Sequence, residues 1–196
     1  GNSNYRAAVD DKCRAAVDDK CRAAVDDKCS TVVDVKCRAI VNENYNAVVI
    51  ENKDTFMSMM KLFNRHYGFM PENKTINLLI YGEGKKIINS FKFMEEITRE
   101  HIIDNIYYYG DIDYEGIGIF LNLKEAYPQY NIIPYVELYK KLIDITDSPP
   151  KLKTSQSIIE IKGFLEYFDE YYKLRISNIL EKGKYIPQEA FSFGRV

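Results

Sequence analysis

From residue 45 onward, short apolar runs alternate with amphipathic helical patterns, and this alternation restricts the chain to few folds. Runs rich in β-branched and aromatic residues at 47–50, 75–81, 105–109 and 131–136 predict strands. Helical patterns lie between them at 55–67, 85–93 and 116–127. Strands that alternate with helices favour a mainly parallel sheet with right-handed crossovers. Pro134 lies inside the last run and favours an edge position or a strand end for it.

A loop with the sequence Asp-Ser-Pro-Pro at 147–150 separates this unit from a tail. Apolar residues recur in the tail at helical spacing, and they predict one long helix over about 155–180. The members of this stripe are Ile158, Ile161, Leu165, Phe168 and Tyr172. We therefore expect an α/β domain with a sheet of about four strands, flanked by helices and followed by a C-terminal helical extension.

The N-terminal part is a direct repeat of the octad Arg-Ala-Ala-Val-Asp-Asp-Lys-Cys. The copies begin at Arg6, Arg14 and Arg22, and a diverged copy covers 30–37. An even period keeps side chains on one face of a strand, which favours an extended stretch near 31–41. The alanine-rich copies are equally compatible with a helix. We predict an octad-repeat extension over 1–44, without chemistry of its own, and a domain over 45–196.

Composition excludes some classes of function. With 46% hydrophobic and 29% charged residues and a net charge of -2, the chain has no overall basic field to attract nucleic acid. No apolar run approaches the roughly 20 residues that span a bilayer, and the N-terminus lacks a signal-peptide pattern. We therefore expect a cytoplasmic protein, not a membrane protein. The four cysteines lie in the repeats, without the close pairs typical of zinc sites, and are expected to be reduced and passive.

Carboxylates follow two of the predicted strands. Glu51 comes after the run at 47–50, and Asp111 and Asp113 come after the run at 105–109. Parallel sheets bind ligands at the carboxyl ends of their strands, and oxygen-only clusters suit Mg²⁺ or Mn²⁺ and hence phosphate chemistry. Helix capping explains each cluster separately: Asn52, Asp54 or Thr55 could begin the helix after Glu51, and Asp113 could cap the helix near Gly116. Metal binding and capping both stay open at this point.

A glycine-containing turn follows the second predicted strand. Gly82 and Gly84 flank Glu83, and Lys85 and Lys86 come next. Backbone amides at a helix start, with lysines beside them, suit a phosphate group. The alternative is a tight turn that needs glycine, because the pattern matches no complete phosphate-binding motif. The two histidines, His66 and His101, lie in polar helical surroundings and are interpreted as surface or partly buried residues.

Three segments carry a resemblance to a known family. They are Val-Ile-Glu-Asn-Lys-Asp-Thr-Phe at 49–56, Tyr-Gly-Asp-Ile-Asp-Tyr-Glu-Gly at 109–116 and, more loosely, Ile-Pro-Gln-Glu at 186–189. Together they resemble a Toprim domain, which has a Rossmann-like sheet. The sequences of these segments most resemble the C-terminal Toprim domain of JetD, the nuclease subunit of the bacterial Wadjet anti-plasmid system. It is also similar to the topoisomerase VI A subunit.

The resemblance implies a Mg²⁺-dependent DNA endonuclease, with Mn²⁺ as a substitute ion. It implies metal-binding and catalytic roles for Glu51, Asp111 and Asp113, and a further acidic ligand at Glu189. Lys53, Gly82, Gly84, Lys85 and Lys86 are the candidates for contact with the DNA backbone. The expected partners are DNA and other subunits of an SMC-like defence complex, and a homodimer stays open. The alternatives are a non-catalytic interaction module and a topoisomerase- or primase-type phosphotransfer domain.

Overall fold

The computed structural model describes residues 32–34, 45–66, 75–99 and 101–191. These residues form a five-stranded sheet in the order β1-β3-β2-β4-β5. Four strands are parallel, and β1 pairs antiparallel with β3 at one edge. The strands are β1 (Val32–Asp34), β2 (Tyr45–Ile50), β3 (Leu78–Tyr81), β4 (Ile103–Tyr109) and β5 (Ile132–Pro134). The mainly parallel α/β sheet predicted from the sequence is thus confirmed.

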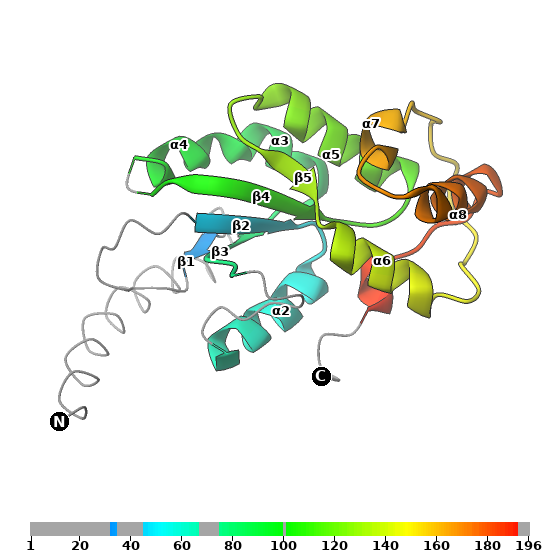
Figure 1. Cartoon of the computed structure of the whole chain (residues 1–196), viewed down its shortest axis with the longest axis horizontal. Coiled ribbons are helices and arrows are strands. Elements are labelled where there is room, and N and C mark those ends of the chain that lie inside the picture. Colours follow the sequence, from blue (N-terminus) through cyan, green and yellow to red (C-terminus); the bar gives the residue numbers. More distant parts are fainter. Residues whose placement is uncertain (1–31, 35–44, 67–74, 100, 192–196) are drawn as a thin grey trace.

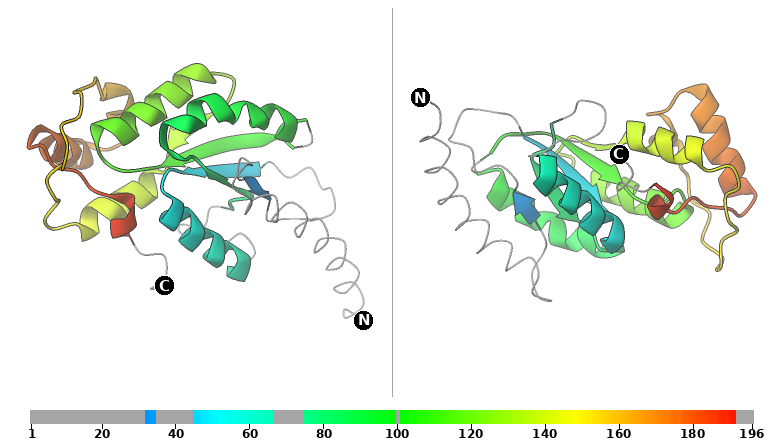
Figure 2. Two further views of the ribbon diagram at one scale, coloured as in Figure 1. Left: turned by 180° about the vertical axis from the view of Figure 1, so that it is seen from behind. Right: turned by 90° about the horizontal axis from the view of Figure 1, so that it is seen from below.

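The central strands are continuous apolar runs because both of their faces are covered. Residues 47–50 of β2 and the second half of β4 are almost completely buried. Helix α2 (Lys53–His66) covers one face of the sheet, and α5 (Tyr114–Ala126) covers the other (Figure 1). The views from behind and from below show the same two layers of helices (Figure 2). This arrangement is the one expected from right-handed crossovers, since α2 connects β2 to β3 in one direction along the sheet and α5 connects β4 to β5 in the other.

The helix predicted over 85–93 is broken into short pieces. They are η2 (Gly84–Lys86), α3 (Ile87–Ser90), η3 (Phe91–Phe93) and α4 (Met94–Ile97). Their buried side chains, which include Ile87, Phe91 and Met94, have the helical spacing that the sequence shows. The aromatic ring of Phe91 packs edge-on against those of Tyr127 and Tyr130, which hold this segment beside the end of α5.

Strand β5 lies at an edge of the sheet and ends at Pro134, in agreement with the predicted edge position. The sequence analysis did not predict the helix that follows, α6 (Val136–Ile145). Its apolar positions Leu138, Tyr139, Leu142 and Ile143 are buried, with the spacing of a helix that packs on one side. The pattern was present in the sequence, but Val136 was assigned to the strand before it.

The prediction of one tail helix over 155–180 is wrong. The chain is extended up to residue 161 and then forms two helices, α7 (Lys162–Leu165) and α8 (Glu170–Glu181). The side chain of Asp169 accepts a hydrogen bond from the backbone amide of Tyr172 at 3.3 Å and thereby starts α8. The side chain of Ile158 is 82% exposed, so it does not belong to the buried stripe that the prediction assumed.

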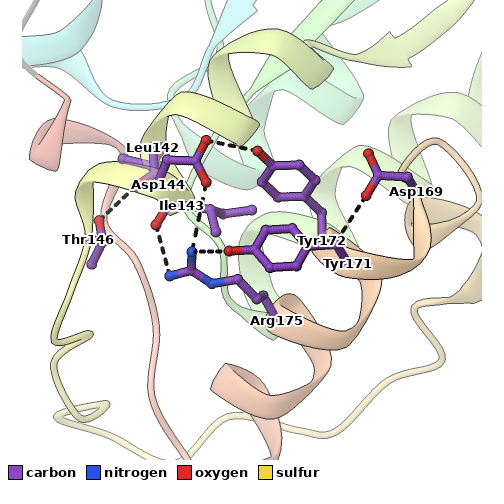
Figure 3. Close-up of polar contacts among 8 residues, drawn as sticks. All are labelled: Leu142, Ile143, Asp144, Thr146, Asp169, Tyr171, Tyr172 and Arg175. Carbon is purple, nitrogen blue, oxygen red and sulfur yellow. Dashed lines mark hydrogen bonds and ion pairs between the residues drawn. The ribbon is translucent and has the colours of Figure 1, made fainter.

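Polar contacts join α6 to α8 (Figure 3). The hydroxyl of Tyr172 donates to Oδ2 of Asp144 at 2.8 Å, and Nη2 of Arg175 donates to the carbonyl of Ile143 at 3.1 Å. Arg175 also donates to the hydroxyl of Tyr171 at 3.1 Å. A carbonyl at the end of α6 thus receives a cationic donor, which suits the negative end of a helix dipole.

Some predictions lie wholly or partly outside the described residues. The octad copies and all four cysteines belong to this group, as does most of the extended stretch over 31–41, of which β1 is described. The side chain of His66 is not described either, whereas His101 is half-buried and stacks on Tyr45, as expected. None of the described helices is both long enough and apolar enough to cross a membrane.

Candidate metal centre

Glu51 and Asp111 follow two neighbouring parallel strands at the point where the strand order reverses. Glu51 comes directly after β2, and Asp111 comes two residues after β4. The backbone amide of Glu51 donates to the carbonyl of Tyr109 at 3.1 Å, so the pairing of the strands continues to the site. The chain leaves β2 for α2 on one face and β4 for α5 on the other (Figure 1). Open α/β sheets bind ligands in the crevice at such a reversal.

The carboxylate of Glu51 is half-buried among groups that oppose its ionisation. Burial, followed by the negative charges of Asp111 and Asp113, raises its pKa to about 7 in total. The hydroxyl of Tyr108 donates to Oε2 at 2.9 Å and acts in the opposite direction. A capping role is taken by the next residue, because Oδ1 of Asn52 accepts from the backbone amides of Asp54 and Thr55. Glu51 itself does not cap α2.

Asp111 is held from the C-terminal part of the chain. The backbone amide of Gln188 donates to its Oδ1 at 2.8 Å. Burial and the charges of Glu189 and Asp113 raise the pKa of Asp111, the hydrogen bonds from Gln188 lower it, and the net value is about 6. Glu51 and Asp111 are thus neighbouring carboxylates with raised pKa values. The negative potential around them favours binding of either a proton or a cation.

Asp113 is buried and has both carboxylate oxygens engaged. Oδ1 accepts from the backbone amide of Gly116 at 2.7 Å, which makes Asp113 the N-cap of α5. Oδ2 accepts from the side-chain amide of Gln156 at 2.8 Å. The capping alternative is therefore confirmed for Asp113, and a metal ion would have to share Oδ2 with Gln156.

Glu189 lies beside the N-terminal end of α2 and is exposed. Its Oε1 accepts from the side-chain amide of Asn52 at 2.7 Å. The charge of Glu189 acts on Asp111, so the structure brings all four predicted acidic residues into one electrostatic neighbourhood. Within the described ranges, however, no group of three His, Cys, Asp or Glu residues is close enough together to hold a metal ion. The donor chemistry suits Mg²⁺, whereas the side-chain positions are not those of a closed metal cage.

Two glycines bring the backbone close to these carboxylates. A Cβ atom on Gly110 would lie 2.2 Å from Oε2 of Glu51, and one on Gly116 would lie 2.6 Å from the carbonyl oxygen of Asp111 and 3.2 Å from Oε2 of Glu51. The space beside Glu51 is thus available because neither position carries a side chain. The two glycines of the sequence Tyr-Gly-Asp-Ile-Asp-Tyr-Glu-Gly are therefore explained by the close approach of the backbone to Glu51 and Asp111.

The glycine-containing turn after β3 adjoins Glu51, since the amide of Gly82 donates to the carbonyl of Ile50 at 2.8 Å. Glu83 and Gly84 have φ values of 51° and 61°, which fits the tight-turn alternative. Lys85 forms an ion pair with Glu115 at 3.0 Å, and Lys86 forms one with Glu83 at 2.5 Å. Neither lysine projects an uncompensated charge toward the acidic residues.

Several residues that support the site were not predicted from the sequence. Tyr108 contacts Glu51, and the hydroxyl of Tyr139 accepts from the backbone amide of Gly110 at 2.8 Å. Gln156 and Gln188 come from the tail and hold the two aspartates. The tyrosine run before Gly110 carried a usable signal, because Tyr108 lies two residues before Gly110 on an extended strand. Gln188 lies in the Ile-Pro-Gln-Glu segment, where only Glu189 was expected to have a role, and nothing in the sequence indicated Gln156, which approaches through long-range contacts.

In a comparison with protein-family models, residues 9–136 match the family described as Wadjet protein JetD, C-terminal. This range covers more than half of the chain. Glu51, Asp111 and Asp113 lie inside it, while Gln156, Gln188 and Glu189 lie beyond its end. A search of curated proteins finds no match.

Proposed function

The chain belongs to the family of Wadjet JetD C-terminal domains, and from this premise we propose that it is a Mg²⁺-dependent Toprim-type DNA endonuclease. Its partners would be DNA and other subunits of an SMC-like defence complex in the cytoplasm. The observation that carries the proposal is the pair Glu51 and Asp111, two partly buried carboxylates at the strand reversal, each within the field of the other. Such a pair is costly to ionise unless a cation neutralises it.

The residues present fit a magnesium ion in their chemistry. Glu51, Asp111 and Asp113 offer only oxygen ligands, which Mg²⁺ prefers. When bound, the ion would stabilise charge on a phosphate group and lower the pKa of a coordinated water molecule. Glu51, with a pKa of about 7, suits the transfer of a proton from water near neutral pH. Asp111 would be a further ligand, because its charge acts on Glu51 from the end of the neighbouring strand.

A plasmid-nicking assay with matched variants tests this proposal. We expect Glu51→Gln and Asp111→Asn each to lower Mg²⁺-dependent nicking at least about a hundredfold, the size of effect that loss of a general base or metal ligand causes. Glu125→Gln and Asp104→Asn are the controls, because both residues are exposed and lie away from the carboxyl ends of the strands. Undiminished nicking by both site variants would contradict the proposal.

The second candidate function is a non-catalytic interaction module. The specific observation in its favour is that the N-cap bond to Gly116 and the bond from Gln156 already occupy both oxygens of Asp113. Thermal unfolding with and without Mg²⁺ or Mn²⁺ distinguishes the two functions. A metal-dependent rise in melting temperature that disappears in Asp113→Asn supports the metal site, and its absence supports the module.

A further inference from the structure

A short two-stranded ribbon at the C-terminal side of the molecule carries four lysines. Lys151 and Lys184 form an antiparallel bridge. Two backbone hydrogen bonds flank it, from the Leu152 amide to the carbonyl of Gly183 at 2.9 Å and from the Tyr185 amide to the carbonyl of Pro150 at 3.1 Å. Lys153 and Lys182 each lie two residues along the chain from this bridge, Lys153 in a bend and Lys182 at the C-terminal end of α8. We call residues 150–153 and 182–185 the lysine ribbon.

The positive charges of the ribbon are uncompensated. Like charges directly opposite each other on paired strands destabilise the pairing. Four lysines elsewhere in the fold (Lys85, Lys86, Lys140 and Lys173) each form an ion pair with a carboxylate. By contrast, the four lysines of the ribbon form no ion pair with any described residue. An anionic partner would remove this repulsion.

The ribbon is continuous with the acidic site. Two residues after Lys184, Ile186 exchanges two backbone hydrogen bonds with Ile112, which lies between Asp111 and Asp113. Two residues of extended chain span about 7 Å. Two residues further on, the amide of Gln188 contacts Asp111. One segment of chain thus connects the lysines to the carboxylates.

We propose that the lysine ribbon binds the phosphate backbone of double-stranded DNA beside the acidic site. This proposal rests on the proposed nuclease function, because it assumes that the acidic site acts on DNA. Binding of DNA to the ribbon does not itself require cleavage. A cluster of carboxylates in a chain of net charge -2 repels DNA, so a nuclease of this composition needs local positive charge next to it. The ribbon supplies that charge, whereas the ion-paired Lys85 and Lys86 do not.

Binding of a short labelled DNA duplex, measured by fluorescence anisotropy in EDTA, tests the ribbon without any cleavage. The variant K151A/K153A/K184A removes three ribbon lysines, and K61A/K92A/K162A removes three exposed lysines elsewhere for the same change in charge. Each phosphate contact contributes about 0.9 to the slope of log affinity against log salt. Between about 50 and 200 mM salt, we expect the ribbon variant to bind at least about tenfold more weakly, with a slope lower by about 2 to 3.

The control triple variant should keep the slope of the unaltered chain, and far-UV circular dichroism should show all three proteins folded. Equal losses in both triple variants would overturn the proposal, as would an unaltered chain that does not bind at low salt. Selective binding of an acidic polypeptide instead of DNA would overturn it too. Glu51→Gln should bind DNA like the unaltered chain in EDTA. Undiminished nicking by the site variants would therefore contradict the proposed nuclease function. Unchanged DNA binding by the ribbon variant would contradict the proposed role of the lysine ribbon.

Discussion

At the scale of single residues, the ionisation of Glu51 connects the site to stability. Its pKa is about 7 in the folded chain against 4.5 for an unperturbed glutamate, so the folded state binds the proton more tightly than the unfolded state. The resulting stabilisation is complete below about pH 4.5 and is lost as the pH rises through about 7. The loss is on the order of 3 kcal/mol when no cation is present.

We therefore predict that Glu51→Gln makes the metal-free protein less sensitive to alkaline pH. Because glutamine does not ionise, the variant should match the unaltered chain near pH 5 and exceed its free energy of unfolding near pH 8. Urea unfolding in EDTA at several pH values measures this difference. Glu125→Gln should follow the unaltered chain. Parallel curves for the unaltered chain and Glu51→Gln would show that Glu51 ionises as freely in the folded state as in water.

Gly110 permits a second prediction at this scale. A Cβ atom there would lie 2.2 Å from Oε2 of Glu51, which is itself held by Tyr108. We expect Gly110→Ala to destabilise the fold by about 1 to 3 kcal/mol, the usual cost of overpacking. In a Glu51→Ala background, the same change should cost less, because the nearest clashing atom is gone and only Tyr108, at 3.0 to 3.1 Å, stays close. A double-mutant cycle measured by urea unfolding tests this. If the destabilisations caused by Gly110→Ala and Glu51→Ala simply add, the prediction is wrong.

At the scale of elements, the extended segment over 152–161 follows helix α5 from its N-terminal end. The side chain of Gln156 accepts from the amide of Glu115 at 3.3 Å and donates to Asp113, and further along Ile159 approaches Gly118. A Cβ atom at Gly118 would lie 3.2 Å from Cδ1 of Ile159. The segment therefore fixes the position of Asp113 relative to α5.

If the proposed metal site is real, Gln156→Ala should weaken metal binding while the protein stays folded. A hydrogen bond that orients a carboxylate ligand is commonly worth about 10- to 100-fold in metal affinity. We expect the Mn²⁺ concentration at half-saturation of the rise in melting temperature to increase by that factor. Gln129→Ala, at an exposed position, is the control. An unchanged midpoint would show that Gln156 only caps Asp113 and has no part in metal binding.

The helices and strands also differ in how well the sequence predicts them. The strand at 47–50 and the helix near Gly116 could be predicted because their hydrophobic pattern is local. The tail could not, because its apolar spacing fits one helix while Asp169 starts a new one. The acidic cluster at Glu51 and Asp111 could be placed from strand ends alone, whereas the contacts of Gln156 and Gln188 depend on long-range packing.

At the scale of the whole molecule, the C-terminal part and the parallel sheet share one core. Phe164 is fully buried, and its ring packs against Phe120 at 5.7 Å and Tyr139 at 5.3 Å between ring centroids. Tyr139 in turn binds the backbone amide of Gly110 beside the acidic site. The tail is thus part of the structure that supports the site, although the family match ends at residue 136.

We predict that Phe164→Ala destabilises the whole protein in a single transition. Removing a buried phenylalanine ring costs about 3 to 5 kcal/mol, because apolar contacts are lost and a cavity is left. Urea unfolding followed by far-UV circular dichroism and by tyrosine fluorescence should give coincident curves, shifted to lower urea without a change of slope. Tyr171→Ala is the control, since its ring is 58% exposed, and it should cost less than about 1 kcal/mol. Two separate transitions would show that the tail unfolds independently of the sheet and that the acidic site does not depend on it.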